Sequence, residues 1–195
     1  MVNYFILVVR LIVSCFLVIL SETEVLAIHP YSDNFPLIFR KEQQRLREIL
    51  GNDCIIEHFG STAIPKTPGK GIIDIMVGFS NWQNLQKAIP KLSKNGYILS
   101  KKDQNKRKNR VFLSTSGEKE SCLGDIHLHL TLKNHPIFRD AMVFRDYLRQ
   151  NSQLRQKYGK HKGDLIKRIN GQRSDYAQLK GVFIKKVLKQ IRTKV

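Results

Sequence analysis

One apolar stretch that contains a single carboxylate constrains the fold more than any other feature of this sequence. Residues 72–79 read IIDIMVGF, and an almost continuous apolar run of this length is typical of an interior strand of a sheet. Asp74 stands inside the run. A carboxylate on a buried strand is costly unless it is paired or binds a metal. The sequence therefore predicts a sheet with an interior acid that is either structural or metal-binding.

Helices and further strands are predicted on both sides of this strand. Apolar side chains recur at three- and four-residue steps over residues 33–51, as in an amphipathic helix, and Gly51 stands at its C-terminal end. We expect another helix at 82–95, helices from residue 136 with breaks near 151–152, 159–163 and 170–171, and strands at 54–59, 97–100, 111–114 and 125–132. The predicted fold class is α+β, with a mixed β-sheet flanked by helices and a C-terminal helical segment.

Residues 1–20 differ in composition from the rest of the 195-residue chain. From residue 4 to residue 20 the segment is apolar except for Ser14, Cys15 and Arg10. An arginine near the centre of a spanning helix costs about 2.5–3.5 kcal/mol, so a membrane anchor is only one of three interpretations. The others are an export signal and a hydrophobic extension or misassigned start. We expect a single folded domain over residues 21–195.

The charge balance points to a phosphate-bearing partner. The chain has 34 Lys+Arg against 16 Asp+Glu, a formal net charge of +18, which favours a nucleotide, a nucleic acid or an anionic membrane surface. Contact with a membrane is expected only if residues 1–20 are retained. A hydrophobic content of 42% excludes disorder of the whole chain. The three cysteines show no CxxC spacing, which argues against a disulfide framework or a cysteine zinc site and favours a cytoplasmic location.

A phosphate site is predicted at Gly60 and Ser61. These residues follow the strand at 54–59 and precede an expected helix start, whose unpaired N–H groups and hydroxyl would suit a phosphate. The alternative is an ordinary strand-to-helix turn in which Ser61 is the N-cap.

A metal site is predicted where two strands bring acids and histidines together. Side chains two residues apart on a strand share a face, so Asp125 shares one with His127 and His129. If the strands are neighbours, Asp74, Asp125 and His127 converge on one divalent cation, and oxygen ligands beside a phosphate suit Mg²⁺ or Mn²⁺. Alternatively, Asp74 is a structural acid and the histidines are the more polar face of a strand.

Four segments carry a resemblance to a known family: residues 57–65 (EHFGSTAIP), 69–75 (GKGIIDI), 127–129 (HLH) and 144–149 (FRDYLR). With residues 30–36 and 176–180, they make the chain similar to the GrpB (UPF0157) family over about residues 25–190. The resemblance implies a nucleotidyltransferase-like fold of the polymerase-β superfamily, in which a Gly-Ser motif is followed by an acidic strand. It brings no established reaction with it.

One position departs from the pattern of that superfamily. Its transferases place two carboxylates as Asp-x-Asp on one strand face, whereas this chain has Met76 at the second position. Two-metal transfer would then need a substitute carboxylate, such as Asp125 or Glu57. The sequence leaves open whether the chain is an active nucleotidyltransferase.

The first functional hypothesis is a nucleotidyltransferase-like protein that binds a nucleoside triphosphate and a divalent cation. Transfer would be attack by an unknown acceptor on the α-phosphate with loss of pyrophosphate. Asp74 and Asp125 are the expected catalytic residues, and Asp74, Asp125 and His127 the expected metal ligands. Gly60, Ser61, Lys70, Arg110, Tyr176 and Lys180 are the expected nucleotide-binding residues, with Lys70 and Arg110 neutralising developing charge.

Two other functions remain open. The first is a non-catalytic nucleotide- or phosphate-binding module, which Met76 favours. The second is a basic RNA-binding protein that uses the loop at 101–110 and the cations of the last helix. No aromatic stacking platform stands among those cations, which argues against RNA.

Overall fold

The computed structural model describes residues 27–101, 109–116, 124–168 and 173–193. Our predictions for residues 1–20, for the basic loop within 102–108 and for the helix break near 170–171 lie outside these residues. In the described part of the chain, no helix is both long and apolar enough to cross a membrane.

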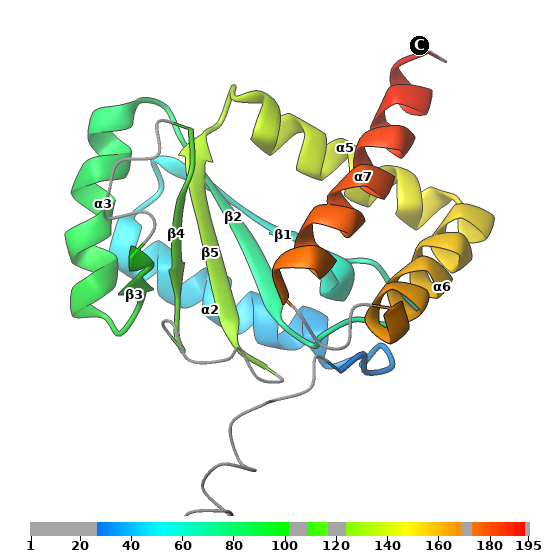
Figure 1. Ribbon diagram of the computed structural model, residues 1–195. Coiled ribbons are helices and arrows are strands. Elements are labelled where there is room, and N and C mark those ends of the chain that lie inside the picture. The colour runs from blue at the N-terminus through cyan, green and yellow to red at the C-terminus, as the bar shows by residue number, and fades with distance from the viewer. Residues whose placement is uncertain (1–26, 102–108, 117–123, 169–172, 194–195) are drawn as a thin grey trace, which may run out of the picture.

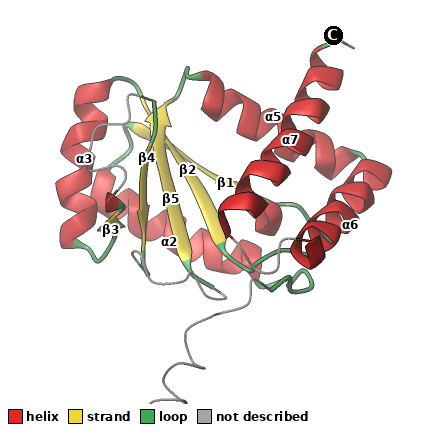
Figure 2. Ribbon diagram, in the orientation of Figure 1, coloured by secondary structure: helices red, strands yellow, loops and turns green. Residues whose placement is uncertain are grey.

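Five strands form one mixed sheet in the order β1-β2-β5-β4-β3 (Figure 2). The strands are β1 (Cys54–Phe59), β2 (Ile73–Phe79), β3 (Ile98–Leu99), β4 (Val111–Ser114) and β5 (Ile126–Leu132). β2 and β5 are parallel, and the other neighbours are antiparallel. The apolar run is therefore an interior strand, as predicted, with a neighbour on each side.

The helices lie on both sides of the sheet (Figure 1). They are α2 (Phe35–Leu50), α3 (Trp82–Lys94), α5 (Pro136–Gln150), α6 (Ser152–Arg168) and α7 (Arg173–Arg192). α2 and α3 cover one face, and α5, α6 and α7 gather at the β1 end of the sheet. The predicted α+β fold, with its mixed sheet, flanking helices and C-terminal helical segment, is confirmed.

The main core lies between α2, α3 and one face of the sheet. The period-two alternation of β2 sends Ile73, Ile75, Val77 and Phe79 into this core, where they are at most 4% exposed. The intervening residues, Asp74 among them, therefore point to the opposite face. A second cluster joins the C-terminal helices to the loop after β1 and includes Ile64, Phe144, Leu148, Tyr158, Val187 and Leu188.

Two local expectations differ from the structure. The helix start expected after Gly60 is a short 3₁₀ turn, Ser61–Ala63, and its N-cap is Gly60 rather than Ser61. The turn ends because Ile64 precedes Pro65, and a residue before proline is disfavoured in the helical region. In addition, α6 runs unbroken through residues 159–163. Gly159 serves close packing there, because a Cβ atom at this position would lie 3.1 Å from Pro68 Cδ.

Candidate functional site

The face of the sheet opposite the core carries the predicted carboxylate and both histidines. Asp74 on β2 is paired in register with Phe59 on β1 and with His127 on β5. Because β5 alternates like β2, His129 shares the face with His127. The expectation that these two strands are neighbours is correct, and their parallel pairing places the three side chains together.

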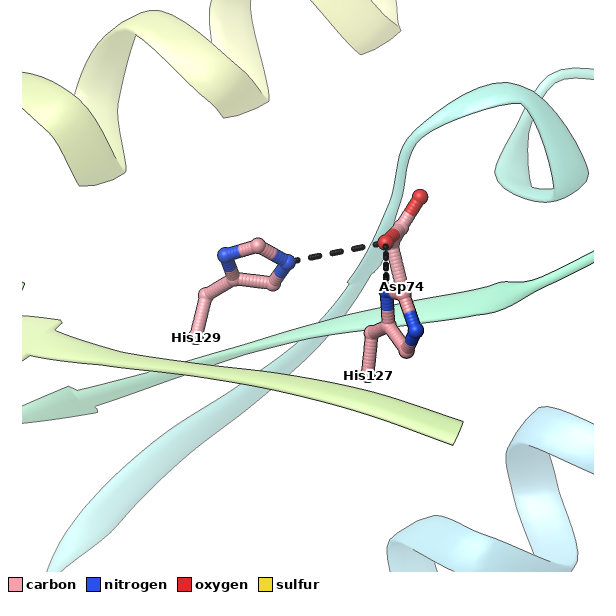
Figure 3. A group of neighbouring side chains, drawn as sticks. All are labelled: Asp74, His127 and His129. Atoms are coloured by element: carbon pink, nitrogen blue, oxygen red, sulfur yellow. Dashed lines mark ion pairs between the residues drawn. The ribbon is translucent and has the colours of Figure 1, made fainter. Parts of the chain in front are cut away.

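Asp74, His127 and His129 point toward one another (Figure 3). Oδ1 of Asp74 lies 3.6 Å from Nδ1 of His127 and 3.5 Å from Nε2 of His129. One potential ligand atom from each residue lies within 4.8 Å of the others. Burial alone would raise the pKa of Asp74, but the two imidazoles outweigh it and hold that pKa well below its usual range. Asp74 is therefore ionised at neutral pH.

Aromatic rings hold the two imidazoles in place. The Phe112 ring meets His127 and His129 edge-on, with centroids 4.9 and 5.1 Å away, and Phe59 meets His129 at 5.0 Å. Burial lowers the pKa of His129 below its ordinary value, and Arg110 lowers it further although Asp74 opposes the shift. Arg110 thus exerts its charge beside this cluster. The sequence analysis placed His129 on the correct face but did not count it among the ligands.

Asp125 lies on the far side of His127. Its Oδ2 is 3.3 Å from His127 Nε2. The carboxylate also accepts hydrogen bonds from the hydroxyls of Thr115 and Ser116 and, at 3.0 Å, from the backbone N–H of Ile126. Asp125 is buried. Both of its oxygens are engaged by these hydrogen-bond donors and by His127, on the side of the ring away from Asp74.

Gly60 brings its backbone against the other oxygen of Asp74. A Cβ atom at this position would lie only 2.4 Å from Asp74 Oδ2, and the residue has a φ of +74°. Both facts require glycine. The next residue, Ser61, accepts a hydrogen bond of 2.7 Å on its Oγ from Nζ of Lys162.

Lys162 is a buried lysine that the sequence analysis did not single out. It comes from α6, is fully buried, also donates to the carbonyl of Pro68, and lies 4.5 Å from the centroid of the Tyr158 ring. Burial and, to a lesser extent, the charge of Lys180 lower the pKa of Lys162 to about 7, although Asp74 opposes the shift. No local pattern points to Lys162, because its partner Ser61 is 101 residues away.

Two further lysines stand around a second buried tyrosine, Tyr176. Nζ of Lys70 and Nζ of Lys180 lie 5.9 and 5.7 Å from the centroid of the Tyr176 ring. Tyr176 is 3% exposed. Lys70, Lys162 and Lys180 are named the lysine cluster below. The structure thus gathers the predicted nucleotide-binding residues Ser61, Lys70, Tyr176 and Lys180 in one region.

Among the residues that the structure describes, the side chains on this face do not fit a pair of Mg²⁺ ions held by carboxylates. Met76, at the second position of the expected Asp-x-Asp, is 1% exposed and offers no oxygen. Asp125 is engaged by Thr115, Ser116 and His127. The cluster that the described parts of the chain form is one carboxylate and two imidazoles, whereas Mg²⁺ prefers oxygen ligands alone.

Comparison with known proteins identifies the family of this chain. The family model described as "GrpB protein" matches residues 25–190. The chain belongs to the GrpB family. A UPF0157 protein of Halalkalibacterium halodurans is 30% identical over 161 residues, which cover 82% of this chain and 79% of that relative. The glutamate-rich protein GrpB of Alkalihalophilus pseudofirmus is 28% identical over 163 residues, which cover 83% of this chain and 92% of that relative.

A solved structure agrees with this assignment. The crystal structure of conserved protein GrpB from Enterococcus faecalis matches with a TM-score of 0.73 and 26% identity over 86% of this chain and 98% of that one. The Cid1 poly(U) polymerase with MgGTP bound also matches, at a TM-score of 0.49 and 16% identity over 71% of this chain and 45% of that one.

Proposed function

We propose that this GrpB-family chain binds a nucleoside triphosphate, with the phosphates held by Ser61 and the lysine cluster. The observation that carries the proposal is Lys162, whose Nζ is buried against neutral oxygens of Ser61 and Pro68. Burial disfavours its charged form and lowers its pKa to about 7, although Asp74 opposes the shift. An anionic phosphate beside Ser61 would supply a closer opposite charge and favour the ammonium form.

The surroundings of Lys162 support a phosphate rather than a weakly charged ligand. Lys180 is near enough to lower the pKa of Lys162, and Lys70 and Lys180 flank the same tyrosine ring. The charges of Lys162 and Lys180 repel each other, and a group with several negative charges relieves that repulsion. The 3₁₀ turn at Ser61–Ala63 is too short to act as a helix N-terminus, so the lysines carry the phosphate in this proposal.

Nucleotidyl transfer is a second candidate function, and the position of Asp74 favours it. In that reaction an acceptor oxygen forms a bond to the α-phosphorus, the bond to pyrophosphate breaks, and the acceptor proton leaves to a base. Asp74 is ionised and lies directly against Gly60, next to the proposed phosphate site. The missing second carboxylate at Met76 favours a binding module that does not catalyse transfer. RNA as a partner stays a prediction, because most of the basic loop lies outside the described residues.

Binding is tested on the full chain with each of the four ribonucleoside triphosphates, by calorimetry and by thermal shift. Tripolyphosphate alone serves as a probe for the phosphates. We expect Lys162→Met to weaken binding about 10- to 100-fold, since a hydrogen bond to a charged group contributes about 1.5–3 kcal/mol. Lys160→Met is the matched control, because Lys160 is exposed on the same helix, and it should bind like the wild type.

Two results would overturn the proposal. The first is the absence of any thermal shift with all four nucleotides, because a ligand of the native state must raise its melting temperature. The second is equal affinity of the Lys162→Met and Lys160→Met variants, which would place the anion elsewhere. Transfer is then scored as pyrophosphate release in the wild type and in Asp74→Asn, and release that is equal in both refutes the second candidate.

A further inference from the structure

We propose that Asp74, His127 and His129 form a binding site for a single Zn²⁺ ion. The three residues lie on neighbouring parallel strands and are held apart at a fixed spacing by the sheet register. This site goes beyond the proposed function, because it requires neither the lysine cluster nor a nucleotide.

The spacing of the three side chains suits one ion of this size. Zinc bonds to imidazole nitrogen and carboxylate oxygen are about 2.0–2.2 Å long, so two ligand atoms around a tetrahedral ion stand about 3.4 Å apart. Asp74 Oδ1 lies 3.5 Å from His129 Nε2 and 3.6 Å from His127 Nδ1. An ion among these atoms needs little movement of the side chains.

His129 supplies an independent observation. Both of its ring nitrogens are buried, and neither has a hydrogen-bond partner within the described parts of the chain. Buried polar atoms in folded proteins are nearly always hydrogen-bonded, so an imidazole without a hydrogen bond calls for an explanation. A metal ion bound to Nε2, the nitrogen that faces Asp74 (Figure 3), provides one.

The donor set favours a borderline transition-metal ion such as Zn²⁺ over a hard ion. Two imidazoles and one carboxylate are the ligands of open zinc sites, which keep a fourth position for water or substrate. Hard ions such as Mg²⁺ require oxygen ligands in a nearly octahedral arrangement. Met76, which is paired in register with His129, offers none.

Asp125 completes the arrangement as a positioning residue. An imidazole that binds a metal commonly donates a hydrogen bond from its second ring nitrogen to a carboxylate. This bond fixes the orientation of the ring and makes the imidazole a stronger metal ligand. Oδ2 of Asp125 lies 3.3 Å from Nε2 of His127, while Nδ1 of the same ring faces Asp74. Thr115 and Ser116 in turn hold Asp125 by their hydroxyls.

The test is a metal titration of the full chain without nucleotide. Zn²⁺ affinity is measured by competition with a chromogenic chelator, and Mg²⁺ affinity by calorimetry. We expect one Zn²⁺ per chain, bound at least 100-fold more tightly than Mg²⁺. His129→Gln should weaken Zn²⁺ binding at least 100-fold, and Asp125→Asn about 10- to 100-fold. His135→Asn is the matched control, because it removes an imidazole from the start of α5 and keeps a capping side chain.

Zinc X-ray absorption of the wild type does not depend on whether any variant folds. We expect it to show two imidazoles bound to the ion. Equal affinities for Zn²⁺ and Mg²⁺, unchanged binding by His129→Gln, or a shell without imidazole would each overturn the site. Failure of the zinc site leaves nucleotide binding at Lys162 intact, and loss of nucleotide binding leaves the zinc titration intact.

Discussion

Lys162 should make the protein more stable as the pH rises above neutrality. A lysine in the unfolded chain has a pKa of about 10.4, whereas burial and Lys180 lower the pKa of Lys162 in the folded protein to about 7. Below pH 7 both states hold the proton. Between pH 7 and about 10.4 only the unfolded state holds it, so the free energy of unfolding rises with pH.

The size of the effect follows from this difference in pKa. One bound proton changes the free energy of unfolding by about 1.4 kcal/mol per pH unit. Relative to Lys162→Met, which has no titrating group here, the wild type should therefore gain about 3 kcal/mol between pH 6 and pH 9. Asp74 and the other groups near Lys162 are present in both proteins, so their own titrations largely cancel in the comparison.

Urea unfolding at constant ionic strength and several pH values between 6 and 9 measures this gain. Lys160→Met is again the control, since its lysine is exposed on the same helix, and its difference from the wild type should not change with pH. A difference between wild type and Lys162→Met that is flat over this range would refute the argument. It would show that Lys162 keeps an ordinary pKa and is reached by solvent.

Three further substitutions test the packing around the site by urea unfolding. Gly60→Ala should lower the free energy of unfolding by about 2–4 kcal/mol, because the added Cβ atom would meet Asp74. Gly51→Ala is its control and should cost only about 1 kcal/mol, because Gly51 also has a positive φ but no atom lies within 4 Å of the added Cβ. Arg145→Met should cost about 2–3 kcal/mol, because buried Arg145 donates hydrogen bonds to Glu57 and to the carbonyl of His58. Arg192→Met is its control and should cost under about 1 kcal/mol, because Arg192 pairs with Asp140 at the surface. Asn81→Ala should cost about 1 kcal/mol, because Asn81 caps α3, while Asn34→Ala at the start of α2 lacks such a bond and should be nearly neutral. In each pair, equal costs would contradict the assigned contact.

The elements could be predicted where a short stretch of sequence decides the structure by itself. The strand at 54–59 has the predicted bounds, and the helices at 33–51 and 82–95 differ from α2 and α3 by one or two residues at their ends, because their apolar periodicity depends only on nearby residues. The predicted break at 159–163 was wrong because Gly159 faces Pro68. That contact joins distant parts of the chain, and a glycine by itself does not reveal whether it ends a helix or lets one pack closely.

The candidate site could be predicted only as far as strand alternation reaches. Asp74 and His127 were placed together on the assumption of neighbouring strands, and the parallel pair of β2 and β5 supplies that neighbourhood. Lys162 could not be found in this way. Its side chain is defined by Ser61, Pro68 and Tyr158, and a lysine in a basic helix looks like any solvated lysine until the fold buries it.

Asp74 joins the two halves of the site, and this has a consequence for how they act together. Its Oδ1 faces the two imidazoles, its Oδ2 lies against Gly60, and its charge raises the pKa of Lys162. A Zn²⁺ ion on Asp74 would neutralise that carboxylate and remove a negative charge from the vicinity of the proposed phosphates. Triphosphate affinity should therefore rise when Zn²⁺ is bound, and Zn²⁺ affinity should rise by the same factor when triphosphate is bound, because coupling between two ligands is reciprocal. Calorimetric titration of each ligand in the presence and absence of the other measures both factors, and affinities that are independent of each other would show that Asp74 does not couple the two sites.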